Sequence, residues 1–384
     1  MITRIAIKNF RSLDVDFTLE PVTVIVGRSG TGKTNLIEAM RFLRKALTSK
    51  AHCVPPNENV YSVTRPETEP MSFHIEFGLG AHYEKYVYAF DVAKKQAAFP
   101  HHPNAINHEV LTLGDRTLFA RQFDKWNGEP RLIQKPAIGV QQLMLPLISG
   151  VQDISLAYLL LTNGVGCYDF PGSVCASESK DDLSPEAGLA DNAHNYAATL
   201  NRIRSNLTRL GDWKEIVGAL QKLNDKIDNV DMNEQQGKRL IVGHKMGEKV
   251  FTLDIANESE GFRRFLAHLL AVYQTPAKQS LFFEEPEKGI HPGALETLAE
   301  ELKAAPADGR GQVILTTHSS ALLDQFDPAG IRVAEMGEHV TKIGRLVPEQ
   351  LAALKEDLLR PGELFTVDPA RMAEGLTASK VAEE

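Results

Sequence analysis

The fold is decided by Gly27-Arg28-Ser29-Gly30-Thr31-Gly32-Lys33-Thr34, a stretch that matches the pattern G-x-x-x-x-G-K-[ST]. It follows a short β-branched run at residues 21–26 that predicts a buried strand, and it precedes apolar residues at helical spacing over residues 33–45. A strand, a glycine loop and a helix in this order are the context that a phosphate-binding loop requires. The sequence therefore predicts that backbone N–H groups of this loop surround phosphates, and an ordinary glycine turn is the alternative.

The loop also carries side chains with predicted roles. Lys33 is expected to bridge the β- and γ-phosphates of a nucleotide, and the Thr34 hydroxyl is expected to ligate Mg²⁺. The residues predicted to bind the nucleotide are Gly27, Arg28, Ser29, Gly30, Thr31, Gly32, Lys33, Thr34 and Asn35.

Two carboxylates follow a second apolar run, Leu281-Phe282-Phe283. A strand that ends in Glu284 and Glu285 delivers both carboxylates to the carboxyl edge of a parallel sheet, where ligands bind in such folds. We expect Glu284 to contact Mg²⁺ and Glu285 to polarise the attacking water as a general base. The alternative is that both glutamates are caps favoured by a helix dipole.

Two further elements fit the same chemistry. His318 follows a third buried strand at residues 313–316, so it is predicted at the same sheet edge, where it could hydrogen-bond the γ-phosphate; a purely structural histidine is the alternative. Ser259 and Gly261 precede an apolar helical pattern and predict an anion site at a helix start. That site suggests the nucleotide of a partner subunit, and an ordinary helix cap is the alternative.

Composition places these residues in an ordinary globular protein. The chain has 384 residues, a net charge of −8, 43% hydrophobic and 24% charged residues, which excludes disordered, collagen-like and disulfide-rich classes. The longest apolar stretch, residues 137–161, is broken by polar residues, so no membrane span and a cytoplasmic location are expected. Three scattered cysteines fit a reducing compartment. The acidic balance leaves only a local basic patch for any nucleic-acid contact.

Apolar strands that alternate with amphipathic helices predict an α/β core with a mainly parallel sheet. Alternation over residues 71–123 predicts antiparallel strands with a turn at Gly114-Asp115, and residues 141–161 are predicted to be helical. Residues 192–230 carry two helical patterns, the second ending at Ile227. The predicted organisation is a discontinuous core at 1–50 and 235–345, an antiparallel β-lobe at 51–135, a short helical arm at 136–234 and a tail at 346–384.

Taken together, these elements resemble the ABC-type ATPase head of SMC, RecF and OLD-family proteins. Ile5-Ala6-Ile7-Lys8-Asn9-Phe10-Arg11-Ser12 resembles the first strand of that lineage. Glu284-Glu285-Pro286-Glu287-Lys288-Gly289-Ile290-His291-Pro292 is similar to the E-E-P-E-x-G-[LI]-H-P form of OLD-like AAA-type ATPases, and Thr317-His318-Ser319 matches their switch histidine. The resemblance implies a P-loop NTPase of the ABC-ATPase type that uses ATP and Mg²⁺.

The resemblance also implies a head-to-tail dimer around two ATP molecules, in which Ser259 and Gly261 of one subunit close on the γ-phosphate at Lys33 of the other. The family's glutamine that contacts Mg²⁺ would fall at Gln141 or Gln142. Ser-Glu-Gly-Phe at residues 259–262 stands where the family has a longer signature that begins with leucine. The resemblance therefore does not fix how this element would approach the nucleotide of the partner subunit.

The expected role follows by analogy with the family. A zinc hook and a long coiled coil are missing, and the residues after His318 are too few for a Toprim nuclease and contain no D-x-D. Stand-alone OLD-like ATPases resemble subunits of bacterial anti-phage systems that act with a separate nuclease or toxin. The alternatives are a RecF-like repair ATPase that binds DNA directly and a slowly hydrolysing ATP-dependent scaffold. A small-molecule phosphotransferase would not need Ser259, Gly261 or His318.

Three other groups of residues are given a structural interpretation or left open. His101, His102 and His108 lack a carboxylate or cysteine partner at metal-ligand spacing, so a solvated loop is preferred. Asp225, Asp228 and Asp231 are interpreted as a solvated helix face and its exit. The basic residues could contact DNA phosphates or form ordinary surface charge or a protein interface. They are Arg41, Arg44, Lys45, Arg202, Arg204, Arg209 and Lys214.

Overall fold

The chain forms two compact units, each of which is described separately. The first comprises Met1–Val165, Ala329–Glu356 and Pro369–Glu384, and the second comprises Gly166–Pro328 and Asp357–Asp368. The computed structural model describes residues 1–49, 51–55, 58–61, 66, 69–80, 83–95, 101–128, 138–180, 188–209, 211–233, 239–356 and 359–373.

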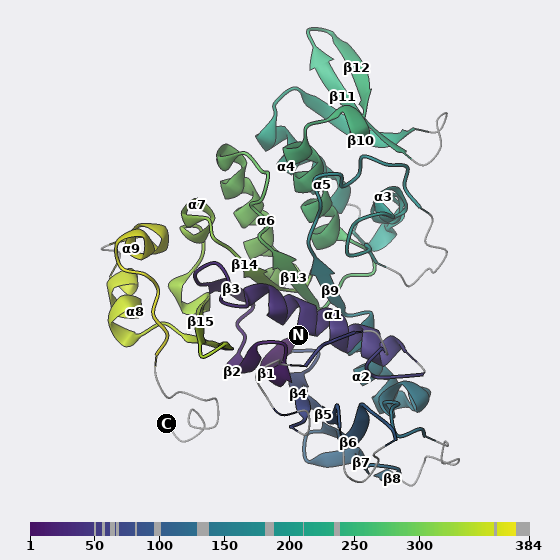
Figure 1. Ribbon diagram of the computed structural model, residues 1–384. Helices are drawn as coiled ribbons and strands as arrows, with labels where there is room; N and C mark the ends of the chain where they lie inside the picture. The colour runs from purple at the N-terminus through teal and green to yellow at the C-terminus, as the bar shows by residue number, and fades with distance from the viewer. Residues whose placement is uncertain are drawn as a thin grey trace. The chain divides into compact units, whose positions relative to one another are not determined.

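The first unit is built on a mixed sheet with the strand order β8-β7-β6-β5-β4-β1-β2-β16-β15-β3. Neighbours from β8 to β2 pair antiparallel, whereas β15 pairs parallel with β3 and β16 pairs parallel with β2. Figure 1 shows β4 to β8 following one another away from β1. The elements are β1 (Ile2–Phe10), β2 (Leu13–Thr18), β3 (Val22–Val26), α1 (Lys33–Thr48), β4 (Met71–Phe77), β5 (Tyr86–Ala93), β6 (Ala105–Leu113), β7 (Arg116–Gln122), β8 (Lys125–Gly128), α2 (Gln152–Thr162), β15 (Ile331–Gly337), β16 (Val340–Arg345) and α8 (Pro348–Lys355).

An aromatic cluster holds α1 on this sheet. The ring of Phe42, on α1, lies 5.3 Å from that of Phe10 and 5.6 Å from that of Phe73, and Phe73 stacks on Phe90 at 5.1 Å. All four rings are buried, and such contacts add to the free energy of burying the rings themselves. The loop between β3 and α1 therefore connects a strand of the sheet to a helix that packs on the sheet, so both of its ends are fixed in the core.

The second unit contains the parallel pair β13 and β14, in which Glu284 lies opposite Thr316, with β9 on the other side of β13. It also contains an antiparallel sheet in the order β10-β11-β12, and Figure 1 shows the β11–β12 hairpin projecting from the far end of this unit. The elements are β9 (Val165–Tyr168), α3 (Tyr196–Ser205), α4 (Asp212–Leu223), β10 (Ile227–Asn233), β11 (Arg239–Met246), β12 (Lys249–Asp254), α5 (Glu260–Tyr273), β13 (Ser280–Glu284), α6 (Leu295–Ala307), β14 (Gln312–Thr316), α7 (Ser320–Leu323) and α9 (Pro361–Val367).

The α/β fold class is confirmed, and several element predictions are corrected. The predicted helix at residues 141–161 begins only at Gln152, because Gly150 and a short 3₁₀ turn at Leu145–Leu147 precede it. Ile227 begins strand β10 instead of ending a helix, so the helix interpretation of Asp228 and Asp231 is wrong.

No helix within the described part of the chain is both long and apolar enough to cross a lipid bilayer.

His268 on α5 gives the second unit a predicted dependence on pH. Its ring lies 4.9 Å from Phe170 and 5.5 Å from Phe283, and its Nδ1–H donates to the Arg264 carbonyl at 2.7 Å. Burial lowers the pKa of His268 to about 4, from 6.5 in an exposed histidine. Between these values the unfolded chain binds the proton that the folded chain excludes. The free energy of unfolding should therefore fall by up to about 3 kcal/mol from pH 6.5 to pH 4.

Chemical unfolding at several pH values measures this dependence. His268→Gln should flatten the curve in that interval, whereas the same change at the exposed His291 should leave it as it is in the wild type. An unchanged curve for His268→Gln would contradict the assignment.

Candidate nucleotide site

The loop at Gly27–Thr34 encloses its own lysine. Lys33 Nζ donates to the carbonyls of Gly27 at 2.8 Å and Arg28 at 2.9 Å, and the Lys33 side chain is buried. The Thr31 hydroxyl donates to the same Arg28 carbonyl at 2.9 Å. Strand β3 delivers the loop, and α1 begins at Lys33, so the ammonium lies where the loop turns into the helix.

The loop presents donors that suit an anion. Ser29 and Gly30 are exposed, and their N–H groups, like that of Gly32, meet no acceptor among the residues that the structure describes. Successive free N–H groups at a helix N-terminus, next to an ammonium, form a phosphate-binding concavity. The residues present therefore fit the phosphates of a nucleotide.

Gly32 is required by its conformation and by its neighbours. Its φ is +86°, and a Cβ there would lie 2.1 Å from Thr341 Oγ1 and 2.8 Å from Ser12 Oγ. Gly30 has a similar φ of +79°, but a Cβ there would meet no atom within 4 Å. Alanine at Gly30 would therefore cause backbone strain alone, whereas alanine at Gly32 would cause the same strain together with a steric clash.

We expect Gly32→Ala to lower the free energy of unfolding by at least about 3 kcal/mol, because it combines left-handed strain with a clash. Gly30→Ala, the matched control, should cost only about 1–2 kcal/mol of strain. Urea unfolding of both variants checks this. Equal losses of unfolding free energy in the two variants would show that the clash of the new Cβ with Thr341 and Ser12 does not contribute.

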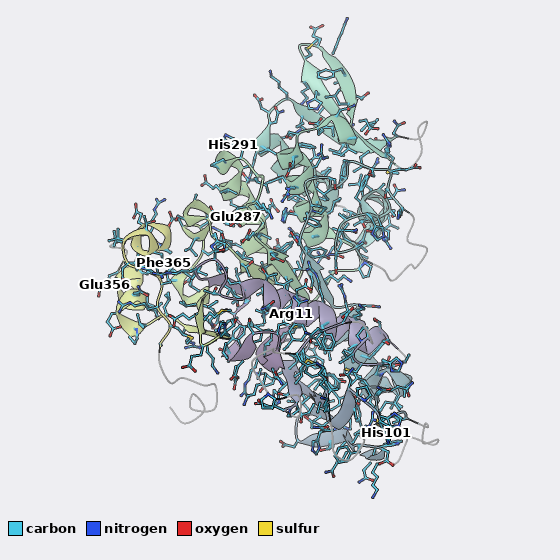
Figure 2. All side chains as sticks on the ribbon, in the orientation of Figure 1. Arg11, His101, Glu287, His291, Glu356 and Phe365 are labelled. Atoms are coloured by element: carbon cyan, nitrogen blue, oxygen red, sulfur yellow. The ribbon has the colours of Figure 1, made fainter. Side chains whose placement is uncertain are left out.

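Asn35 joins the loop to the turn between β1 and β2. Its amide donates to Ser12 Oγ at 2.8 Å, and Ser12 Oγ lies 2.7 Å from Thr341 Oγ1. Arg11, labelled in Figure 2, donates to Asn35 Oδ1 at 3.4 Å and lies 3.6 Å from Glu38 on α1. Sequence reasoning predicted Asn35 as a nucleotide-binding residue and gave Ser12 and Thr341 no role. Ser12 and Thr341 are far apart in sequence, so no local pattern links them.

In the second unit, Glu285 and His318 come together at the ends of neighbouring parallel strands. Glu285 follows β13 with a φ of +44°, and its N–H donates to the Thr316 carbonyl at 3.1 Å. His318 Nε2 lies 3.4 Å from Glu285 Oε1, and both side chains are partly exposed. Glu284, the last residue of β13, lies opposite Thr316. The pairing of β13 with β14 thus aligns the predicted base with the predicted switch histidine.

Ser259 and Gly261 lie at the exposed start of α5. Ser259 Oγ accepts a hydrogen bond from the Phe262 N–H at 3.2 Å, so it caps the helix. A Cβ on Gly261 would lie 2.8 Å from the Gly289 carbonyl, which means that this turn packs closely on the loop after β13. Arg263 ties the same turn to residues 172–174 by donating to the carbonyls of Gly172 and Val174. Sequence reasoning missed both the packing and the arginine.

The two glutamine candidates lie in the first unit, on a segment held by a buried charge pair. Arg121 donates to the carbonyls of Gly139 and Gln142 and lies 3.7 Å from Glu109, whose pKa is raised by burial. Gln142 Oε1 accepts from the Gly139 N–H at 2.8 Å, and the carbonyl of Gln141 accepts from the Cys53 N–H at 2.8 Å.

Two family models match the chain. Residues 1–125 match the AAA ATPase domain model, and residues 182–324 match the model described as AAA domain, putative AbiEii toxin, Type IV TA system. No curated protein matches the chain in sequence.

Solved structures of SMC heads share its fold. The SmcHead bound to the C-winged helix domain of ScpA is 15% identical, with a TM-score of 0.56 over 91% of this chain and 99% of that one. The Pyrococcus furiosus Smc head with an extended coiled coil, bound to the C-terminal domain of ScpA, is 13% identical, with a TM-score of 0.56 over 93% and 99%. The fold is therefore that of an SMC head.

Proposed function

We propose that this chain binds ATP and hydrolyses it to ADP and phosphate. The loop around Lys33 carries the proposal, because its ammonium and its free N–H groups suit the phosphates of a nucleotide. Gly27, Arg28, Ser29, Gly30, Thr31, Gly32, Lys33, Thr34 and Asn35 would bind the nucleotide. Both AAA domain matches support ATP as the ligand.

The oxygen donors that would hold Mg²⁺ are the Thr34 hydroxyl, the Glu284 carboxylate and the Gln142 amide oxygen. Each of these side chains offers an oxygen of the class that Mg²⁺ prefers. When bound, the ion neutralises negative charge on the phosphates.

The remaining side chains would act on water and on the γ-phosphate. Glu285 would accept the proton of the attacking water, and its neighbour His318 would donate a hydrogen bond to a γ-phosphate oxygen. The 3.4 Å contact between the two side chains supports a shared role. Lys33 would neutralise charge on the same phosphate.

We also propose a head-to-tail dimer as the working form, a nucleotide-driven switch or scaffold. Ser259 and Glu260 are exposed at the N-terminus of α5, so this turn is accessible to a second chain. In the proposed dimer, Ser259 and the Gly261 N–H approach the γ-phosphate bound by the partner subunit. A helix N-terminus attracts an anion through its free N–H groups and its dipole.

The proposed setting is bacterial defence, in partnership with a separate nuclease or toxin. The toxin–antitoxin description of the model matched by residues 182–324 supports this setting. Much of the basic surface that could contact DNA is neutralised within the chain, which favours a protein partner over direct, RecF-like DNA binding. The pairs are Arg41 with Glu38, Lys45 with Glu58, Arg204 with Asp231, and Arg209 with Asp212.

Phosphate release from ATP by the purified chain tests the proposal. Turnover should require Mg²⁺ and stop with EDTA, and light scattering should detect dimers when ATP is present. Absence of both ATP binding and turnover would refute the function, and binding with almost no turnover would favour the scaffold. A nuclease or toxin gene next to this reading frame would favour defence over repair.

A further inference from the structure

We propose that Glu287 is a positioning residue that sets the geometry of His318 through a single carboxylate oxygen. The inference deepens the proposed ATPase function and rests on it. Glu287 Oε1 accepts three hydrogen bonds, from Thr317 Oγ1 at 2.7 Å, the His318 N–H at 3.0 Å and the Ser319 N–H at 3.2 Å. This one oxygen thus accepts a hydrogen bond from each of the three residues of the Thr317–Ser319 turn.

The turn is held from its other side as well. Thr317 is buried, and its Oγ1 accepts a second bond from the Ser319 N–H at 3.0 Å. Ser319 Oγ in turn caps α7 by accepting from the Leu322 N–H at 3.2 Å. The backbone on both sides of His318 is therefore fixed, while its side chain is 40% exposed and faces Glu285.

Glu287 is itself placed by the loop that follows β13. The Lys288 N–H donates to the Glu285 carbonyl at 2.9 Å, and the Ile290 N–H donates to the Glu287 carbonyl at 3.0 Å. Arg264 on α5 donates to the Lys288 carbonyl at 3.0 Å. Figure 2 shows Glu287 on this loop, with His291 farther along it before α6. The loop that presents the proposed base therefore also presents the oxygen that orients His318.

The second carboxylate oxygen, Oε2, shows that the negative charge of Glu287 is not needed for its contacts with the Thr317–Ser319 turn. Glu287 Oε2 is buried and has no hydrogen-bond partner among the residues that the structure describes. A buried acceptor without a partner is unfavourable and requires an explanation. Since Oε2 makes no bond, the contacts of Glu287 with the turn depend on Oε1 alone. A glutamine, which keeps an acceptor oxygen at that position, should therefore preserve them.

The test compares Glu287→Ala with Glu287→Gln. Glu287→Ala should lower kcat for ATP by about 10- to 100-fold, because the loss of a positioning contact misplaces a reacting group. Its KM for ATP should stay within about twofold of wild type. Glu287→Gln should keep kcat within about threefold. Glu296→Ala, at an exposed glutamate in the first turn of α6, is the matched control and should match wild type.

A double substitution tests whether Glu287 acts through His318. In the His318→Ala background, Glu287→Ala should lower kcat by no more than about twofold further, because the group that it positions is already gone. If both single losses multiply in the double variant, Glu287 acts independently of His318 and the inference is overturned. A kcat as low in Glu287→Gln as in Glu287→Ala would also overturn it, since the charge would then matter.

A measurement without nucleotide separates this inference from the proposed function. In spectra of protein labelled with ¹⁵N-histidine, the His318 ring signals are identified by their loss in His318→Ala. They should shift in Glu287→Ala and stay in place in Glu287→Gln. Unmoved signals in Glu287→Ala would overturn the positioning role even if the wild type hydrolyses ATP. Shifted signals in a chain that shows no turnover dependent on Lys33 would uphold the positioning role and refute only the ATPase function.

Discussion

Replacement of Lys33 by alanine is expected to weaken ATP binding by at least about 100-fold. The ammonium is buried in the loop and donates to the Gly27 and Arg28 carbonyls, so in the proposed complex it exchanges these contacts for charged phosphate oxygens. Hydrogen bonds with an ionised donor or acceptor are about twice as strong as those between neutral groups, and the opposite charges of ammonium and phosphate add a Coulomb attraction that a carbonyl does not offer. Titration calorimetry with ATP and Mg²⁺ measures the loss.

Two further variants make this result specific. Lys33→Met keeps most of the side-chain volume and should lose binding as Lys33→Ala does, which excludes a packing defect as the cause. Lys45→Ala removes an exposed lysine from the same helix, where it pairs with Glu58, and should bind ATP as the wild type does. ATP affinity in Lys33→Met within threefold of wild type would remove Lys33 from the proposed site.

Replacement of Glu285 by glutamine is expected to lower kcat by about 10²- to 10⁴-fold, the usual contribution of a general base. The amide cannot accept the proton of the attacking water, but it keeps the size of the side chain. ATP affinity should stay within about threefold of wild type. Because ATP would then persist, light scattering should show the proposed ATP-bound dimer accumulating.

The control for Glu285 is an exposed glutamate of the same unit that has no assigned role. Glu296→Gln, on the exposed first turn of α6, should keep wild-type turnover. Unchanged phosphate release by Glu285→Gln would reject Glu285 as the base. Loss of ATP affinity in that variant would instead assign Glu285 a role in binding.

Several element boundaries were identified from local signals. Residues 22–26 form β3, α1 begins at Lys33, and β13 ends at Glu284, because a β-branched run, a glycine loop and an apolar run each act over a few residues. Ile227 was assigned to the wrong element, since an apolar residue at helical spacing also fits the alternation of a strand. Antiparallel pairing with β11 decides between the two patterns there.

In the candidate site, too, some features are predictable from local sequence and others depend on strand pairing. Glu285 and His318 are predictable because each follows an apolar run that ends at a turn, and parallel strands bring such ends to one sheet edge. Glu287 belongs to the same quoted stretch, but no periodicity indicates that its Oε1 accepts from residues 317–319. That contact depends on the φ of +44° at Glu285 and on the β13–β14 register, which place the two loops next to each other.

By itself the sequence determined which side chains are available: a loop with Gly32 and Lys33, two glutamates where an apolar strand ends, and His318 shortly after a later strand. These choices are local, because backbone conformation and side-chain charge act over a few residues. Only the tertiary structure decided which groups meet, such as Thr341 with Ser12, Gly261 with Gly289, and Glu287 with the turn around His318. Those contacts join residues far apart in the chain, and strand pairing and packing alone set their distances.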